Sequence, residues 1–236
     1  KIKMKNLIKI ITFIIISLTI PINLFAGDIP IIVISPGKTP QSYDKVGSSV
    51  SVIEEKEIQN SSNFFIADII GSKTTASNMF QMGGHGSNIG IQLRGLEKRY
   101  STVYVDGVKM SDPSSSDNSY YMENIMKNSI ERVEILKGTQ SSLYGSNAIG
   151  GTIHIFTKKG KEGKRSNFEV ESGSNNTKNM FYSLDGSTNK FNYYLGLNKF
   201  LTDGVSAMNH NDENDAYNNK GLTGKIGYQF NECFKI

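Results

Sequence analysis

The chain has 236 residues, 20% of them charged and 10% aromatic, with a formal net charge of +4 at pH 7. This length holds one or two domains of ordinary size. The positive charge is modest and spread along the chain, so it does not indicate a nucleic-acid partner. The single cysteine, Cys233, excludes an intrachain disulfide and a zinc site built from several cysteines.

The first 26 residues have the pattern of a secretory signal peptide. Lysines are frequent in the first nine residues, residues 10–20 form an apolar run, and Ala26 precedes a cleavage position before Gly27. The run is too short to be a good membrane span, so we predict export and cleavage, with an uncleaved anchor helix as the alternative. No later stretch approaches 18 apolar residues, so any membrane-spanning structure here would have to consist of β-strands.

Residues 27–45 carry a short apolar run, Ile31–Ile34, between prolines. Pro30, Pro36 and Pro40 disfavour a helix and favour an extended, exposed segment.

Residues 46–160 are expected to form a small α+β domain. The run SVSVI at 49–53 predicts a strand. Ile58 and the apolar spacing at 65–70 predict a short amphipathic helix, with Ser61 or Ser62 as its N-cap and Gly71 near its end.

The middle of this domain alternates between loops and strands. Residues 79–88 predict a loop, and residues 89–94 and 100–105 each predict a strand. Asp106-Gly107 predicts a tight hairpin turn after the second strand. Residues 111–121, rich in serine, predict a polar loop.

Residues 130–158 are the most informative stretch of the chain. The β-branched residues Ile130, Val133 and Ile135 alternate with charged residues, which predicts a half-buried strand. A glycine-rich bend follows at 143–151, and residues 152–157 predict a second strand. The unit is therefore strand, glycine-rich turn, strand.

Residues 161–236 change in character. Apolar and polar residues alternate over about four strands, with aromatic residues among the apolar positions and a short turn at Thr188-Asn189, as in an outer-membrane barrel. A soluble antiparallel sheet with one dry face has the same periodicity, and four strands are too few to close a barrel. The apolar stripe expected to face outward comprises Tyr182, Leu184, Tyr193, Leu195, Ile226 and Tyr228.

Three segments resemble, in order and spacing, the plug domain of TonB-dependent outer-membrane receptors: LRGL at 93–96, TVYVDGVKMSDP at 102–113, and the stretch 130–158. The resemblance favours the barrel over the soluble sheet. The predicted fold is an α+β plug domain, a small mixed sheet with short helices, followed by the first antiparallel strands of a transmembrane β-barrel that is incomplete in this chain. The predicted divisions are a signal peptide (1–26), a TonB box and linker (27–45), the plug (46–160) and the first barrel strands (161–236).

The resemblance implies a TonB box, a segment that the periplasmic protein TonB captures by strand addition. It assigns the box to Ile31, Ile32, Val33, Ile34 and Ser35. The family often has an acidic residue and a threonine where this chain has Pro30 and Ile31, and an alanine in place of Pro36. An ordinary first strand of the plug is the alternative.

The resemblance also implies ion pairs between the plug and the barrel wall, assigned here to Arg94, Arg132 and Glu134. Such pairs can rearrange and would suit a movable plug, although desolvation offsets their attraction. Solvated strand faces are the alternative for these residues.

Substrate in this family binds the extracellular loops of plug and barrel. The candidate positions here are Met82, His85, Ser87, Asn88, Ser114, Asp117 and Asn118. The acidic loop 209–219 is a candidate calcium site through Asp212 and Asp215, because hard oxygen ligands bind calcium and cobalamin receptors of the family carry such a loop. Its spacing fails the EF-hand pattern, and a solvated polar loop is the alternative. No other cofactor is indicated.

No catalytic constellation is present. His85, His154 and His210 lie in separate segments, and no phosphate-loop or dinucleotide-binding pattern occurs, so we expect no enzyme activity.

The predicted function is active uptake of a scarce large nutrient, of the cobalamin or iron-siderophore class, into the periplasm. The implied location is the outer membrane of a Gram-negative bacterium. The implied partners are TonB with its inner-membrane energising complex, outer-membrane lipid, and a metal-chelate or cobalamin-type ligand. A truncated plug-only module that binds without transport is the alternative. A structural adhesin is a third hypothesis, against which residues 130–158 argue.

Overall fold

The computed structural model describes residues 31–206, 208 and 213–230. The predicted signal peptide and its cleavage position lie outside the described residues. The chain divides into two units, residues 1–31 and 32–236, and the description below concerns the second.

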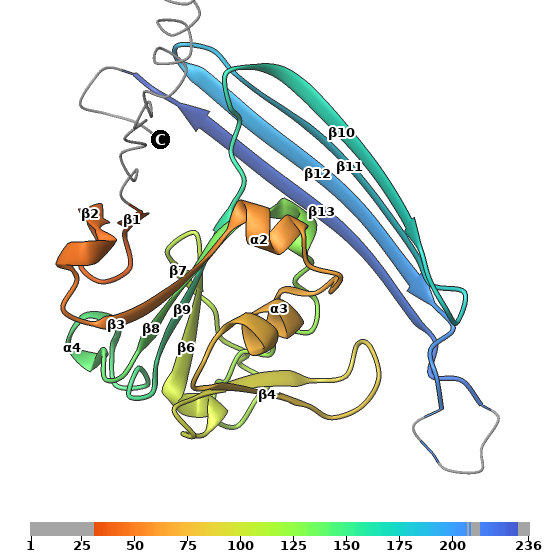
Figure 1. Cartoon of the computed structure of the whole chain (residues 1–236), viewed down its shortest axis with the longest axis horizontal. Coiled ribbons are helices and arrows are strands. Elements are labelled where there is room, and N and C mark those ends of the chain that lie inside the picture. The colour runs from red at the N-terminus through yellow and green to blue at the C-terminus, as the bar shows by residue number, and fades with distance from the viewer. Residues whose placement is uncertain (1–30, 207, 209–212, 231–236) are drawn as a thin grey trace, which may run out of the picture. The chain divides into compact units, whose positions relative to one another are not determined.

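A five-stranded mixed sheet forms the centre of the N-terminal domain (Figure 1). Strands β6 and β9 are parallel, and the other neighbours in the sheet are antiparallel. The strands predicted near residues 49–53, 100–105, 130–137 and 152–157 are all present. In sheet order they are β3 (Ser49–Glu54), β8 (Ile130–Lys137), β9 (Gly151–Thr157), β6 (Ser101–Val105) and β7 (Val108–Lys109).

The Asp106-Gly107 turn joins β6 to β7 as predicted. Both residues have positive φ, 48° and 83°, which is the backbone that a two-residue hairpin with right-handed strand twist requires. A second hairpin pairs β4 (Ser77–Gln81) with β5 (Ile89–Leu93). The loop predicted at 79–88 is therefore shorter, because residues 79–81 pair with β5.

The prediction of one helix capped by Ser61 or Ser62 is wrong. Two helices form, α2 (Glu55–Gln59) and α3 (Ile66–Lys73), and the chain between them turns where Ser61 Oγ accepts a hydrogen bond from the Asn63 N–H. Phe65 stays extended because it bridges to Met126, so α3 starts after it and continues past Gly71.

The remaining helical elements are short. Helix α4 (Ser141–Tyr144) interrupts the glycine-rich bend, where the sequence predicted only a turn. Three 3-10 turns complete the helical elements of the described chain: η1 (Tyr43–Lys45), η2 (Lys98–Tyr100) and η3 (Lys127–Ser129).

The core of the plug lies between α3 and the sheet. It is built almost wholly from β-branched and leucine side chains, including Ile70, Leu93, Val133, Ile135 and Ile153. Strand β8 is more buried than the predicted half-buried strand: Glu134 and Lys137 are buried, because other parts of the chain cover the polar side of this strand as well.

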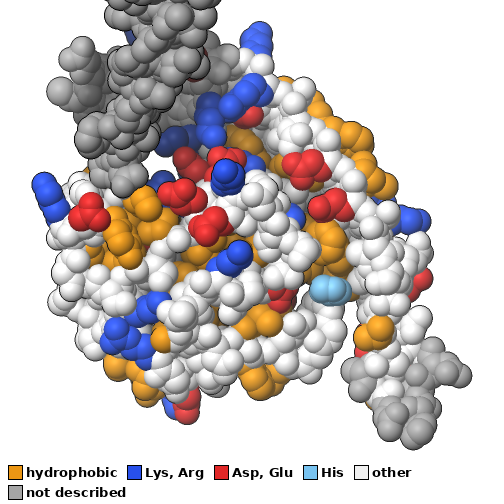
Figure 2. Space-filling view, in the orientation of Figure 1, with side chains coloured by type: hydrophobic (Ala, Val, Ile, Leu, Met, Phe, Trp, Pro, Cys, Tyr) orange, Lys and Arg blue, Asp and Glu red, His pale blue; other side chains and the backbone are white. Residues whose placement is uncertain are grey.

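Residues 163–228 form a separate antiparallel sheet, whose strands follow each other in chain order and do not close on themselves. The predicted alternation is confirmed: Tyr182, Leu195 and Ile226 lie on the outer face, and Phe181 and Phe200 are buried on the inner one. In Figure 2 hydrophobic side chains follow the edge where β10 and β11 lie. The strands are β10 (Gly163–Ser172), β11 (Lys178–Ser187), β12 (Phe191–Thr202) and β13 (Tyr217–Tyr228).

Among the described residues no helix has the length and apolar content needed to cross a membrane.

Candidate functional site

The apolar run at the start of the described chain is only partly exposed. Strand β1 (Ile32–Val33) pairs with β2 (Gln41–Ser42), and Ile32 remains 48% exposed. Val33 is fully buried against Val50 and Leu136. The expectation of an exposed segment is therefore wrong at Val33 and Ser35, which are buried, whereas residues 37–40 are exposed. Val33 is buried because the plug has apolar side chains that pack around it.

A buried carboxylate holds the residues that follow. Glu134 Oε2 accepts hydrogen bonds from the Ile34 N–H at 3.0 Å and the Ser35 N–H at 2.8 Å. Its Oε1 accepts from Arg132 Nε at 2.8 Å. Tyr144 in α4 donates its hydroxyl to the Ser35 carbonyl. We call Glu134, Arg132 and Tyr144 the cradle; it joins residues 34–35 to β8 and α4, about a hundred positions along the chain.

Aromatic rings line the space beside the cradle. His154 stacks on Tyr104 with ring centroids 4.8 Å apart, and it lies equally far from Tyr144. Lys38 places its ammonium 5.0 Å from the centre of the Tyr144 ring, a cation–π contact. A cavity of about 270 Å³ opens between these side chains and residues 34–35.

Burial sets the protonation of this region. It lowers the pKa of His154 from 6.5 to about 4 and raises that of Tyr144 to about 12, so both groups are neutral at pH 7. Burial would also raise the pKa of Glu134, but hydrogen bonds from Ser35, Arg132 and Ile34 outweigh it, and the net shift is downward. The cradle therefore presents an anion to two main-chain donors.

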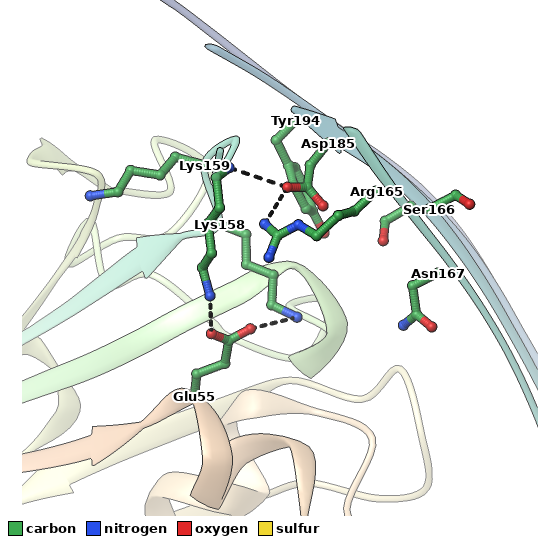
Figure 3. A pocket seen from close by; sticks show the side chains of 10 residues that line it. Glu55, Lys158, Lys159, Arg165, Ser166, Asn167, Asp185 and Tyr194 are labelled. Carbon is green, nitrogen blue, oxygen red and sulfur yellow. Dashed lines mark hydrogen bonds and ion pairs between the residues drawn. The ribbon is translucent and has the colours of Figure 1, made fainter. Parts of the chain in front are cut away.

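A second cluster lies where the plug runs into β10 (Figure 3). Glu55 accepts from Lys158 at 3.3 Å and Lys161 at 2.9 Å, which holds α2 to the connecting segment. Burial opposes ionisation of Glu55, yet the two lysines bring its pKa below the ordinary value. Gly160 packs so closely that an added Cβ would lie 2.0 Å from the Gly186 carbonyl oxygen, so only glycine fits there.

Beside it, the connecting segment also binds β11. The Lys161 N–H and the Arg165 guanidinium both donate to Asp185, the latter at 2.5 Å (Figure 3). The connecting segment is therefore fixed to both the plug and the sheet.

A third site lies at the opposite end of the four-stranded sheet, where Figure 1 shows the β10–β11 and β12–β13 loops. Residues of these loops and of the β4–β5 loop of the plug line an open cavity of about 450 Å³, which we call the loop pocket. Its lining residues are Phe64, Gln81, Gly83, Gly84, His85, Gly173, Ser174, Asn175, Thr177, Thr202, Gly204, Val205 and Asp215.

Aromatic packing fixes the plug side of the loop pocket. His85 lies 5.4 Å from Phe65 and 5.3 Å from Phe200, between ring centroids, and it stacks on Tyr217. Gly86 has φ +84°, and a Cβ there would lie 2.4 Å from the Tyr217 ring. The loop is thus held against β12 and β13, with His85 at the cavity wall.

Comparison with known proteins agrees with these features. A family model for the TonB-dependent receptor plug domain matches residues 42–152. The chain carries the plug domain of a TonB-dependent receptor. The vitamin B12 transporter BtuB of Photobacterium profundum is 26% identical over 229 residues, which cover 93% of this chain and 36% of that protein.

Solved structures share the fold of this receptor. The ferripyoverdine receptor of the Pseudomonas aeruginosa outer membrane superposes with a TM-score of 0.69 and 16% identity, over 86% of this chain and 26% of that one. The siderophore receptor PirA of Acinetobacter baumannii gives a TM-score of 0.61 and 20% identity, over 78% and 29% of the two chains. The receptor chain described here spans about a third of the length of the curated relatives.

These relatives are transport receptors rather than enzymes, and TonB-dependent receptors are outer-membrane proteins of Gram-negative bacteria. The predicted plug and barrel-start fold is confirmed by the family match and the solved structures.

The three residues predicted to pair the plug with the barrel lie in the plug. Arg132 and Glu134 form an ion pair with each other at 2.8 Å. Arg94 has positive φ and lies beside Gly138 of the plug. Pairing of Arg94, Arg132 or Glu134 with a barrel strand stays a prediction.

Different residues join plug and sheet. Lys225 of β13 pairs with Asp106 at 3.1 Å, and Glu171 of β10 lies 3.9 Å from Lys127. These pairs could not be predicted from the sequence, because each joins residues far apart in the chain through side chains that also suit a solvated surface.

The predicted substrate residues fall in two places. His85 lines the loop pocket, Met82 is exposed next to it, and Ser87 and Asn88 complete the same loop through bonds to Gly84 and Met82. The second predicted loop does not reach the loop pocket. Its Asp117 binds Lys98 at 3.1 Å and lines a smaller cavity, and Ser114 and Asn118 are exposed beside it.

Of the two predicted calcium ligands, the structure describes one. Asp212 lies outside the described residues, and Asp215 is exposed and lines the loop pocket. Within the described ranges no group of three or more His, Cys, Asp or Glu side chains could hold a metal ion. Calcium binding by Asp212 and Asp215 stays a prediction.

Proposed function

We propose that this chain is the plug and first barrel strands of an outer-membrane receptor that takes up cobalamin into the periplasm under the power of TonB. Substrate would bind at the loop pocket, at the end of the sheet away from the connecting segment. TonB would bind the Ile31–Ser35 segment.

The side chains that line the loop pocket are the main reason for proposing cobalamin as the substrate. Its lining is made of amide and hydroxyl side chains, glycines and two apolar residues, and His85 and Asp215 are its titratable members. No lysine or arginine is among the described residues that line it. An anionic ferric chelate calls for cationic partners, whereas a corrinoid ringed by amide groups matches neutral donors and acceptors.

The similarity to vitamin B12 transporters supports the same choice. The solved siderophore receptors support only the fold, because their identity to this chain is low.

The outer face of the four-stranded sheet supports a location in the membrane. Its exposed apolar residues, such as Leu195, Leu197, Leu222 and Ile226, form the stripe that lipid would cover once further strands complete the wall. The predicted signal peptide would deliver the chain to the periplasm, with the mature form starting near Gly27.

Ligand binding by the full-length receptor tests the proposed substrate. We expect cells that lack their own cobalamin receptor to bind and import labelled cyanocobalamin when they express it, and excess ferric catecholate should not compete. Binding of the ferric chelate without binding of cyanocobalamin would contradict the proposal.

A pair of matched substitutions tests whether the ligand binds in the loop pocket. Gln81→Lys adds a charge at the wall of the loop pocket, and we expect it to weaken cyanocobalamin binding by about tenfold, or ~1.4 kcal/mol. Asn189→Lys adds the same charge in the exposed turn at the other end of the sheet and should leave binding unchanged. Equal effects of the two would place the ligand outside the loop pocket.

A further inference from the structure

The two ends of the outer face of the four-stranded sheet carry different side chains. At the end next to the connecting segment, the aromatic residues Phe191 and Tyr228 lie opposite each other on β12 and β13, and both are exposed. At the end next to the loop pocket, the same face carries one exposed lysine on each of three neighbouring strands. We call these the lysine row: Lys178 on β11, Lys199 on β12 and Lys220 on β13.

The strand register brings the three lysines together. Lys199 lies directly opposite Lys220, and Lys178 lies diagonally from Lys199, which faces Met180. Residues directly opposite each other in an antiparallel pair have Cβ atoms about 5 Å apart, and like charges there destabilise the sheet. Within the described chain none of the three lysines forms an ion pair with a carboxylate. An anion from outside these residues would relieve the repulsion.

The lysine row continues the apolar stripe and ends it. On β12 the chain from Phe191 to Lys199 rises about 27 Å, and a strand tilted by about 40° covers about 20 Å of membrane depth over that length. The apolar band of an outer-membrane barrel is about 25 Å tall, with aromatic residues at its boundaries. Phe191 and Tyr228 would therefore reach one headgroup layer, and the lysine row would reach the other.

An open cavity of about 270 Å³ beside the lysine row adds polar groups. Its lining includes Lys178, the amide side chains of Asn176 and Asn218, and the carboxylate of Asp203. Amides and carboxylates form hydrogen bonds with hydroxyl groups, whereas phosphate pairs with the lysines. A headgroup that carries both phosphates and sugar hydroxyls matches the lysine row and the cavity together.

We propose that the lysine row and this cavity bind the phosphorylated sugar headgroup of a glycolipid in the outer leaflet of the membrane. Phosphate oxygens would accept hydrogen bonds from the ammonium groups and offset the repulsion between Lys199 and Lys220. Each lysine near an anionic membrane surface strengthens the attachment by about fivefold. This inference rests on the proposed function, because it takes the outer face of the sheet as facing lipid, with the loop pocket on the extracellular side.

Lipid binding by the purified full-length receptor in detergent tests the proposal, with fluorescent lipid A, a bisphosphorylated disaccharide lipid, as the probe. We expect Lys199→Gln combined with Lys220→Gln to weaken lipid A binding by about 25-fold, and the corresponding pair of arginine substitutions to keep it. Lys164→Gln combined with Lys190→Gln removes the same charge from exposed lysines at the other end of the sheet and should match the wild type. Phosphatidylglycerol, which has one phosphate and no sugar, should bind the wild type more weakly than lipid A.

Thermal unfolding without lipid adds a measurement that a merely structural role would change. The Lys199→Gln and Lys220→Gln pair removes only repulsion, so the melting temperature should not fall. A lower melting temperature would show that these lysines pair with another part of the receptor and would overturn the inference, and so would equal binding of lipid A and phosphatidylglycerol. An outer-membrane receptor whose two glutamine pairs bind lipid A alike would overturn this inference alone. A receptor absent from the outer membrane would overturn the proposed location together with it.

Discussion

The plug and the four-stranded sheet bury their apolar side chains in different ways. The plug encloses a core between α3 and the mixed sheet, with side chains such as Ile70 and Ile153 fully buried. The sheet packs Phe181, Tyr194 and Phe200 inward and leaves its other face apolar and exposed. The plug thus buries its apolar core within itself, whereas the sheet leaves one apolar face uncovered.

This difference assigns separate tasks to the two regions. The sheet supplies a wall that is fixed to the plug at one end by Glu55 and at the other by the aromatic contacts of His85. The plug holds residues 33–35 through the buried side chain of Val33 and through hydrogen bonds to Glu134 and Tyr144.

We expect the largest difference between the two regions in the solubility of the whole chain and of the plug alone. The 236-residue chain expressed alone exposes the outer stripe and the unpaired edges of β10 and β13, so we expect it to aggregate or to be cut back to about residue 160. A chain covering residues 27–161 should be soluble and monomeric. Gel filtration with limited proteolysis measures both, and a soluble 236-residue monomer that resists protease past Phe230 would refute the contrast.

Core truncation should give the next largest effect. Ile153 is fully buried in the plug core, so Ile153→Ala in the 27–161 chain should cost about 4 kcal/mol of unfolding free energy. Val108→Ala, at a position 66% exposed, should cost less than about 0.5 kcal/mol. Urea unfolding measures the two, and equal losses would mean that the plug core is not closed without the barrel.

Acid should destabilise the plug through His154. Its pKa is about 4 when folded and 6.5 as the ordinary value, so the unfolded chain binds the proton first. The contribution of neutral His154 to the free energy of unfolding is fully present above pH 6.5. It falls by up to about 3 kcal/mol as the pH drops towards 4. Glu134, whose pKa is lowered, adds a loss only below its ordinary value of 4.5. Unfolding between pH 7 and 5 should show this slope in the wild type, and His154→Gln should flatten it; an equal slope in both would exclude His154 as the cause.

The ion pair between plug and sheet should contribute least. Lys225 and Asp106 lie 3.1 Å apart with side chains about one-third exposed, where solvent screens the attraction. A double-mutant cycle in the full-length receptor with Lys225→Met and Asp106→Asn should give a coupling below about 1 kcal/mol. A coupling of several kcal/mol would show that charge, rather than the contact of Phe65 with Phe200, joins the two regions.

Local patterns explain what the sequence predicted. The alternation in residues 130–158, the Asp106-Gly107 turn and the dyad repeat after residue 163 are each set by neighbouring residues, and the structure has all three. The N-cap prediction at Ser61 or Ser62 failed because the bridge of Phe65 to Met126, sixty residues away, decides where α3 begins.

The site was less predictable for the same reason. His85 was predicted as a substrate residue because the resemblance places its loop at the extracellular end, and that role stays a prediction. Its contacts with Phe200 and Tyr217 join residues far apart in the chain and leave no local signal in the sequence. The resemblance implies an ion pair between Glu134 and the barrel, which stays a prediction. Only the fold shows that the chain's own N-terminal segment contacts Glu134.

Uptake by full-length Ile32→Pro measures whether the N-terminal segment and the loop pocket are coupled. Proline removes a main-chain donor from the segment and leaves the loop pocket untouched, whereas Ile32→Ala keeps the donor. We predict that Ile32→Pro abolishes cyanocobalamin uptake while binding stays within about twofold of the wild type, and that Ile32→Ala retains both. Uptake by Ile32→Pro at the wild-type rate, or equal loss of binding and uptake, would contradict the account.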